Sequence, residues 1–134
     1  MKEQFVSYDL SKKLEELGFN EPCLAYYCED IIRYDGKKHE YITHKYITPD
    51  EYEEVRFSKR IKSVFSPLWQ QVIDWLRERY NCNIILTQSR HNGCWIYTLE
   101  GIEDNKPYSL FRSYPIAREM AILRIIELIN VKHQ

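Results

Sequence analysis

Two short turn signals constrain the fold of this 134-residue chain more than any other feature. Asp35-Gly36 and Asn92-Gly93 each stand between runs rich in aromatic and β-branched residues. Such pairs favour the two-residue turns that join antiparallel strands, because both residue types tolerate a positive φ. The sequence therefore predicts two β-hairpins, one around residue 35 and one around residue 92.

The register of the second hairpin follows from the length of its turn. A two-residue turn at Asn92-Gly93 places Arg90 opposite Trp95 and Leu86 opposite Leu99. An arginine beside an aromatic ring on a neighbouring strand forms a cation–π pair. We therefore expect Arg90 and Trp95 to form a surface contact near the end of this hairpin.

Three segments carry the apolar spacing and the end signals of α-helices. Residues 7–17 are followed by Gly18, which favours a left-handed stop. Ser66 is the expected cap of a helix over residues 67–80, and Pro67 suits its first position. Ser113 is the expected cap of a last helix over residues 114–129.

The remaining segments predict strands and one short helix. They are 23–28 and about 39–47 for the first hairpin, 82–90 and 94–101 for the second, 108–112 for a third strand beside it, and 49–54 for the short helix. The order is α-β-β-(short α)-α-β-β-β-α. The prediction is a single α+β domain over residues 1–134, with antiparallel strands in hairpins packed against two main helices.

Composition restricts the partners and the compartment. The net charge of −1 argues against a surface built throughout for nucleic acid. The N-terminus lacks the apolar core of a signal peptide, and no apolar run approaches the roughly 18 residues of a membrane span. We expect a cytoplasmic protein with no membrane partner, whose cysteines stay reduced.

The helix over residues 67–80 contains two of the three tryptophans. Trp69 lies on its core-facing stripe, whereas Trp75 lies on a flank with Leu68 and Arg79. Trp75 either packs beneath a neighbouring segment or, with Leu68 and Arg79, forms an exposed anchor for a protein partner. The sequence leaves both interpretations open.

The last helix is apolar nearly all round. One apolar stripe is formed by Ile116, Met120, Leu123 and Ile126, and another by Ala117, Ala121, Ile125 and Leu128. Such a helix must be covered on more than one side. It is either a central helix between the sheet and other helices, or its outer face meets a second copy of the chain.

The residues that could carry catalysis or bind a metal form no convincing group. Cys23, Cys28, Cys82 and Cys94 lack the close spacing of structural zinc sites. Paired acids such as Glu29-Asp30 and Glu103-Asp104 are expected to be solvated loop charges. We therefore predict no metal and no cofactor, assign no catalytic residue, and leave enzymatic activity unsupported.

A basic segment offers an alternative function. Arg56, Lys59, Arg60 and Lys62 follow one another without an intervening acid. Such a cluster can neutralise phosphates, so it is a candidate nucleic-acid site. A solvated connection with internal ion pairing is the competing interpretation.

Three segments resemble small uncharacterised proteins of phages and integrated elements in Bacteroides-type bacteria. They are VSYDLSKKLEELGFNEPCLAYY at 6–27, PLWQQVIDWLRERYNCNI at 67–84, and AREMAILRIIELI at 117–129. The resemblance implies a phage or mobile-element accessory protein. It assigns no activity and no functional residue.

The sequence analysis favours a small accessory protein that binds a protein partner or associates with itself through its last helix. The nucleic-acid module using residues 56–62 is the first alternative, and an enzyme of unknown class is the second.

Overall fold

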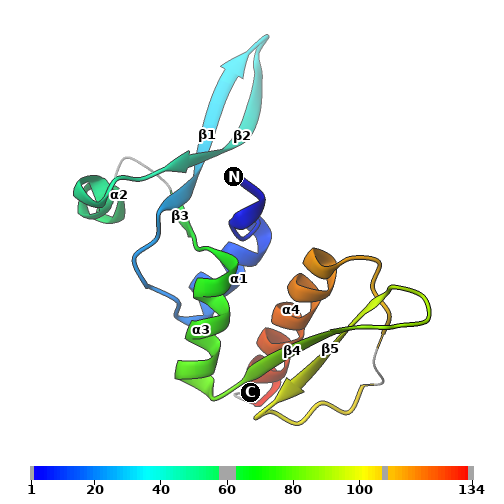
Figure 1. The fold of residues 1–134 in the computed structure, drawn as a ribbon. Coiled ribbons are helices and arrows are strands. Elements are labelled where there is room, and N and C mark those ends of the chain that lie inside the picture. The colour runs from blue at the N-terminus through cyan, green and yellow to red at the C-terminus, as the bar shows by residue number, and fades with distance from the viewer. Residues whose placement is uncertain (1, 58–62, 107–108, 133–134) are drawn as a thin grey trace. The chain divides into compact units, whose positions relative to one another are not determined.

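The computed structural model of the protein describes residues 2–57, 63–106 and 109–132. It has antiparallel sheets and helices, so the α+β class is confirmed, and the elements follow the predicted order. The chain divides into two units, Met1–Trp69 and Gln70–Gln134. Each unit is described separately below (Figure 1). The single domain over residues 1–134 stays a prediction.

The first unit contains a three-stranded antiparallel sheet in the order β2-β1-β3. Its elements are η1 (Lys2–Gln4), α1 (Tyr8–Leu17), β1 (Ala25–Tyr34), β2 (Lys37–Tyr46), η2 (Pro49–Glu51), α2 (Tyr52–Phe57) and β3 (Ser63–Ser66). On one side of the sheet, Tyr26 and Cys28 form an apolar cluster with Ile47 and Val55. This cluster fixes the short helix α2 to the strands.

The predicted end of α1 is confirmed. Gly18 adopts a φ of 106°, and its N–H donates to the carbonyl of Glu15. The N–H of Phe19 reaches back to the carbonyl of Leu14 at 2.9 Å. These two bonds satisfy carbonyls that the helix end would leave unpaired, and Phe19 is buried against the last turn.

The first hairpin has the predicted turn, but Ser66 is not a helix cap. Tyr34 pairs with Lys37 across Asp35-Gly36, as a two-residue turn requires. Ser66 pairs with Ala25 in the sheet, and its hydroxyl donates to the carbonyl of Val6 at 3.1 Å. The cap prediction was wrong because pairing with distant parts of the chain holds Ser66 in β3.

The second unit contains a two-stranded sheet and a long helix. Its elements are β4 (Asn83–Gln88), β5 (Trp95–Glu100) and α4 (Tyr114–Lys132), preceded by α3 (Trp69–Tyr80), which starts at the last residue of the first unit. α4 packs against both strands. The N–H of Ile116 donates to Ser113 Oγ at 3.4 Å, which confirms Ser113 as the cap.

The predicted register of the second hairpin was wrong by two residues. Trp95 lies opposite Gln88 rather than Arg90. The N–H of Ser89 donates to the carbonyl of Cys94 at 2.7 Å, so four residues form the loop. Side-chain bonds stabilise this longer loop, among them the bond from the Cys94 N–H to Asn92 Oδ1 at 3.0 Å. A shift of two residues leaves every side chain on its predicted face.

The segment expected as a third strand contributes one bridge in the described part of the chain. Phe111 and Trp95 exchange two backbone hydrogen bonds of 2.7 and 2.9 Å. The ring of Phe111 also stacks on Tyr97 at 5.8 Å between centroids. The segment before α4 is thereby attached to the outer edge of β5.

The open end of the second hairpin contains a close backbone approach. Gly101, directly after β5, has a φ of 84°. A Cβ atom built on Gly101 would lie 1.9 Å from the carbonyl oxygen of Asn81, two residues before β4. Position 101 therefore accepts only glycine, because any side chain there would collide with the backbone of Asn81.

Candidate functional site

The residues predicted to bind a protein partner occupy three different environments. Trp75 is buried, with 8% of its surface exposed, and its ring meets Tyr80 edge-on at 5.5 Å. Arg79 is exposed and lies over the Tyr80 ring, 6.0 Å from its centroid. Leu68 is half-buried and forms an isolated bridge with Phe5. Burial favours the core interpretation of Trp75, and partner binding by Leu68, Trp75 and Arg79 stays a prediction.

The basic segment is described only at its start. Arg56 is exposed on α2, and its guanidinium lies over the ring of Tyr52, 6.0 Å from the centroid. Lys59, Arg60 and Lys62 lie outside the described residues. Nucleic-acid binding by this segment therefore stays a prediction.

One buried carbonyl group in the first unit accepts three side-chain hydrogen bonds. The carbonyl of Val6 accepts from Tyr27 Oη at 2.7 Å, Ser66 Oγ at 3.1 Å and Ser11 Oγ at 3.4 Å. Burial raises the pKa of Tyr27, so its hydroxyl keeps its proton at neutral pH. These bonds attach the segment before α1 to β1 and β3.

His44 and Ser66 have the spacing of a catalytic pair but not its chemistry. His44 Nε2 lies 3.1 Å from Ser66 Oγ. The hydroxyl proton is donated to the Val6 carbonyl, which can only accept, so Nε2 is the donor in its contact with Ser66. A nucleophilic serine instead needs a base that takes its proton. Ser66 is also 0% exposed, so the pair is structural.

An open pocket of about 450 Å³ lies between α1 and the first hairpin. Tyr8 donates a hydrogen bond to Glu29, and Lys12 Nζ lies 3.7 Å from the same carboxylate. The bond to Glu29 raises the pKa of Tyr8, and the Tyr8 hydroxyl raises the pKa of Lys12. Both groups stay protonated at neutral pH, so neither serves as a base here. Glu29 is thus a bonded group of β1 rather than the solvated loop charge expected.

The cysteines are described as free thiols. Burial raises the pKa of Cys23 to about 12 and also raises the pKa values of Cys28 and Cys82. A protonated thiol is a poor nucleophile and a poor metal ligand. Within residues 2–57, 63–106 and 109–132, no group of three or more His, Cys, Asp or Glu side chains is placed to hold a metal ion.

The apolar residues of α4 lie on two opposite faces. The buried face is filled by Ala117, Ala121, Ile122, Ile125, Ile126 and Ile129. On the other face, Ile116 is 47% exposed and Met120 is 41% exposed, one helical turn apart. Leu123 is half-buried at the next position of this row. We call Ile116, Met120 and Leu123 the α4 strip. The sheet covers one face of α4, and the strip remains accessible.

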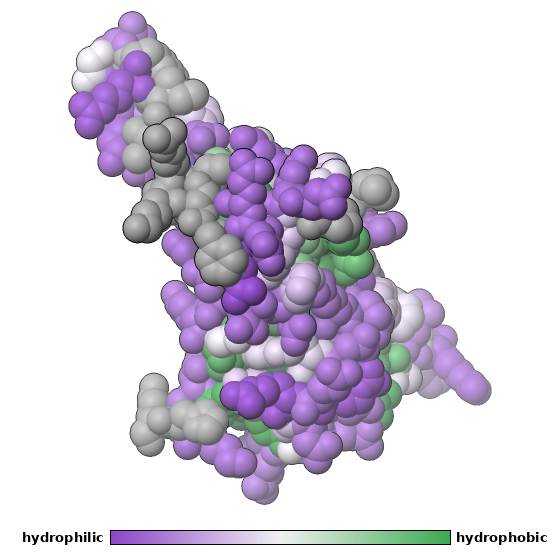
Figure 2. Space-filling model, turned by 90° about the vertical axis from the view of Figure 1, so that its left-hand side faces the viewer, coloured by the Kyte–Doolittle hydropathy of each residue, from purple (hydrophilic) through white to green (hydrophobic). Residues whose placement is uncertain are grey.

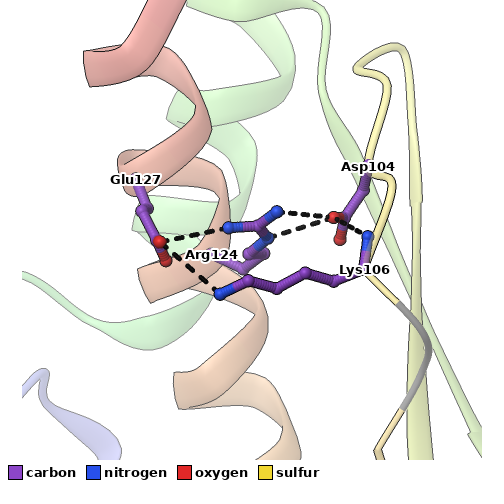
Figure 3. A network of polar contacts seen from close by, with 4 residues as sticks. All are labelled: Asp104, Lys106, Arg124 and Glu127. Carbon is purple, nitrogen blue, oxygen red and sulfur yellow. Dashed lines mark hydrogen bonds and ion pairs between the residues drawn. The ribbon is translucent and has the colours of Figure 1, made fainter.

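Four charged side chains compensate one another beside the strip (Figure 3). Arg124 Nη2 and Nε lie 2.8 and 3.1 Å from Asp104 Oδ1, and Arg124 Nη1 lies 3.2 Å from Glu127. Lys106 Nζ lies 3.6 Å from Glu127, and the Lys106 N–H donates to Asp104. The network holds the loop after β5 on α4. Asp104, expected to be a solvated loop charge, is instead 16% exposed in its side chain and paired with Arg124.

The pairing of Asp104 predicts a pH-dependent contribution to stability. The hydrogen bond from Arg124 lowers the pKa of Asp104 in the folded protein. The contribution is therefore present above the unfolded-state pKa of about 3.9 and is lost as the pH falls through the lower, folded value. Asp104→Asn should lower the free energy of unfolding at pH 7 by about 1 kcal/mol.

Urea unfolding at a series of pH values tests this prediction. The difference between the wild type and Asp104→Asn should shrink below about pH 4. Glu127→Gln is the control, because Glu127 is 54% exposed and its ion pairs contribute less. A difference that stays constant down to pH 2 would contradict the assignment.

None of the described helices is long and apolar enough to cross a membrane. Comparison of the chain with models of protein families, with curated proteins and with solved structures finds no match.

Proposed function

We propose that the protein acts by binding protein, and that its partner is a second copy of the chain docked through the α4 strip. The observation that carries this proposal is the exposure of Ile116 and Met120 on a helix whose other face is already filled. Adjacent apolar side chains in water are unfavourable, and a second apolar surface removes that cost. A small self-associating protein also suits the phage or mobile-element accessory role that the resemblance implies.

Two features favour a second copy over a partner of another chemistry. The strip consists of unbranched and branched aliphatic side chains, which complement the same strip in a two-fold dimer. Arg124 and Glu127, at the C-terminal end of the strip, are already paired with Asp104 and Lys106 (Figure 3). Two copies therefore meet there without uncompensated charges of one sign, and a highly charged partner finds no matching patch.

The size of the strip sets the expected affinity. Three side chains cover less than the roughly 800 Å² per partner of a standard stable interface. We therefore expect a monomer–dimer equilibrium, visible by sedimentation equilibrium between about 1 µM and about 1 mM. A wild-type chain that stays monomeric throughout this range contradicts the proposal.

Ile116→Glu separates loss of the dimer from loss of the fold. Ile116 is the third residue after the cap Ser113, so a glutamate there completes the Ser-x-x-Glu capping box. The charge of the glutamate also lies at the positive end of the helix dipole. The capping box and this charge together should stabilise the monomer by about 0.5–1 kcal/mol. We expect the variant to unfold at a higher temperature and to remain monomeric.

Leu24→Glu is the matched control. Leu24 belongs to the first unit and is 53% exposed, close to the exposure of Ile116. The substitution Leu24→Glu therefore introduces the same charge at a similarly exposed apolar position. It should leave the monomer–dimer equilibrium unchanged. Equal weakening by both substitutions would show that added charge, rather than the strip, controls association.

A further inference from the structure

The second hairpin has an open edge along β4. Within the described residues, β4 pairs with β5 alone. Trp95 of β5 directs both its N–H and its carbonyl to Phe111, on the side away from β4. Gln88, which lies opposite Trp95, therefore belongs to a pair without mutual hydrogen bonds, and its main-chain groups point away from β5. Because this direction alternates along a strand, the main-chain groups of Leu86 and Ile84 point the same way.

We call the outward N–H and C=O groups of Ile84, Leu86 and Gln88 the β4 edge. In the part of the chain that the structure describes, none of these groups has a hydrogen-bond partner. Successive members of the row are two residues, or about 6.6 Å, apart. A second extended backbone presents donors and acceptors at this spacing, so a β-strand is the structure that fits the β4 edge.

β4 lacks the features that keep most edge strands from pairing. Natural edge strands usually carry charged side chains, a proline or a bulge. The outer strand β2 of the first unit contains four charged residues, which are Lys37, Lys38, Glu40 and Lys45. The end of the first hairpin accordingly presents hydrophilic surface, at the top of Figure 2. In contrast, the six residues of β4 (Asn83–Gln88) include no charged residue, proline or glycine.

The side chains of β4 define what an added strand should present. Ile84 and Leu86 are half-buried on one face of the hairpin, whereas Ile85 and Thr87 are exposed on the other. The side chains of an added strand also alternate between these two faces. Apolar residues are therefore favoured beside Ile84 and Leu86, and residues of either kind are accepted beside Ile85 and Thr87.

Opposite charges lie at the two ends of the β4 edge. Arg90 lies two residues beyond Gln88, and Glu100 lies opposite Asn83 at the other end. Both charged residues are exposed, and neither forms an ion pair within the described residues. An antiparallel strand complements them if it has an acid at its N-terminal end and a base at its C-terminal end.

We propose that the β4 edge binds an extended segment of a partner protein as an added antiparallel strand. The middle of this segment is uncharged and has apolar residues at alternate positions, with an acid beside Arg90 and a base beside Glu100. The proposal is separate from self-association, because the β4 edge and the α4 strip share no residue.

Amide hydrogen exchange of the free chain, followed by NMR, tests whether the edge is open. The N–H groups of Ile85 and Thr87 point toward β5 and should exchange slowly. Those of Ile84, Leu86 and Gln88 should exchange rapidly, although they belong to the same strand. Slow exchange at all five positions would show that another part of the chain already covers the edge, and would overturn the proposal.

The binding probe is a peptide of about eight residues with blocked ends, in which glutamate is first, lysine is last, and valine and threonine alternate between them. We expect a dissociation constant between about 0.1 and 1 mM, because one added strand is smaller than a standard interface. At a free peptide concentration of about four times this constant, exchange of the Ile84 and Leu86 amides should slow about fivefold. A peptide with the terminal glutamate and lysine exchanged should bind about threefold more weakly.

N-methylated peptides distinguish strand addition from contact through side chains alone. Two peptides carry methyl groups on one or the other alternate set of backbone nitrogens. Methyl groups on the set that faces β4 remove hydrogen-bond donors, so this peptide should not bind. Methyl groups on the other set should change the affinity about twofold at most. Equal binding of the two methylated peptides contradicts the proposal.

Gln88→Pro and Gln88→Ala form a matched pair of variants. Because the Gln88 N–H points away from β5, proline at this exposed position leaves the hydrogen bonds between β4 and β5 intact. It removes one donor of the β4 edge, so the peptide should bind about tenfold more weakly. Gln88→Ala loses the same side chain, with its bond to the Gly93 carbonyl, but keeps the N–H, so the affinity should change about twofold at most. An equal loss in both variants would overturn the proposal.

The Ile116→Glu variant keeps this test separate from the proposed self-association. The peptide should bind equally well to Ile116→Glu and to the wild type. A wild-type chain that stays monomeric and still binds the peptide contradicts the self-association alone. Without peptide, protection of the Ile84 and Leu86 amides that rises with protein concentration would identify a second copy as the added strand, and would overturn the proposal of a different partner.

Discussion

Trp75→Ala is expected to lower the free energy of unfolding by about 3–5 kcal/mol, as removal of a buried tryptophan does in other cores. Trp75 is 8% exposed and lies on α3 next to the fully buried Leu76. Removal of the indole leaves a cavity. The closely packed residues around it can move to fill that cavity only in part. Urea unfolding followed by circular dichroism measures the change without depending on the fluorescence of the removed residue.

Arg79→Ala is the matched control for Trp75→Ala. Arg79 is exposed on the same helix, so its removal should change the free energy of unfolding by less than about 0.5 kcal/mol. A loss below about 1 kcal/mol for Trp75→Ala would contradict the core assignment and restore the exposed-anchor interpretation.

Gly101→Ala is expected to destabilise the protein by about 3 kcal/mol or more, which places it among the most disruptive single substitutions. The alanine Cβ would lie 1.9 Å from the Asn81 oxygen and 3.0 Å from the Asn81 carbonyl carbon. Because both neighbouring atoms belong to the backbone, no side chain can rotate away. The ends of β4 and β5, where Asn83 pairs with Glu100, must separate instead.

Gly18→Ala isolates the part of this effect that comes from φ alone. Gly18 has a φ of 106°, yet no atom lies within 4 Å of a Cβ built on it. Its substitution should therefore cost about 1–2 kcal/mol, the price of a left-handed backbone at a residue with a side chain. Thermal unfolding of both variants tests the comparison, and equal losses would rule out the close approach at Gly101.

Elements whose signals are local were predicted from the sequence. The stop of α1 depends on Gly18 and Phe19, the turn of the first hairpin on Asp35-Gly36, and the start of α4 on Ser113. Each signal acts through hydrogen bonds within a few residues, so the neighbouring sequence contains the information it needs.

Errors arose where distant contacts or competing side chains decide the structure. Ser66 resembles a cap in its own neighbourhood, but it pairs with Ala25, 41 positions earlier in the numbering, and bonds to Val6. Asn92-Gly93 signals a two-residue turn, but hydrogen bonds from Ser89 and Cys94 select a four-residue loop. The turn propensity of Asn-Gly does not take these hydrogen bonds into account, so it predicted too short a loop.

The candidate surfaces were predicted in part. Because α4 is apolar nearly all round, the sequence indicated that a second face of this helix must be buried by another surface. Only the structure shows that Ile116 and Met120 are exposed whereas Ile126, on the same predicted stripe, is buried. The sequence alone did not show that Arg33 and Lys38 lie side by side, because the strand register brings them together. The bond between Asp104 and Arg124 could not be predicted from the sequence, because the two residues are 20 positions apart.

The two tryptophans of α3 contact different parts of the chain, and this makes them separate optical probes. Trp69 is the last residue of the first unit, and its indole N–H donates to the carbonyl of Glu3 at 3.0 Å. Trp75 packs against Tyr80 in the second unit. Emission from Trp69, in a chain whose other indoles are replaced by phenylalanine to keep the cavities small, therefore reports release of the N-terminal turn. Emission from Trp75 reports melting of the second core, with no foreign label on either unit.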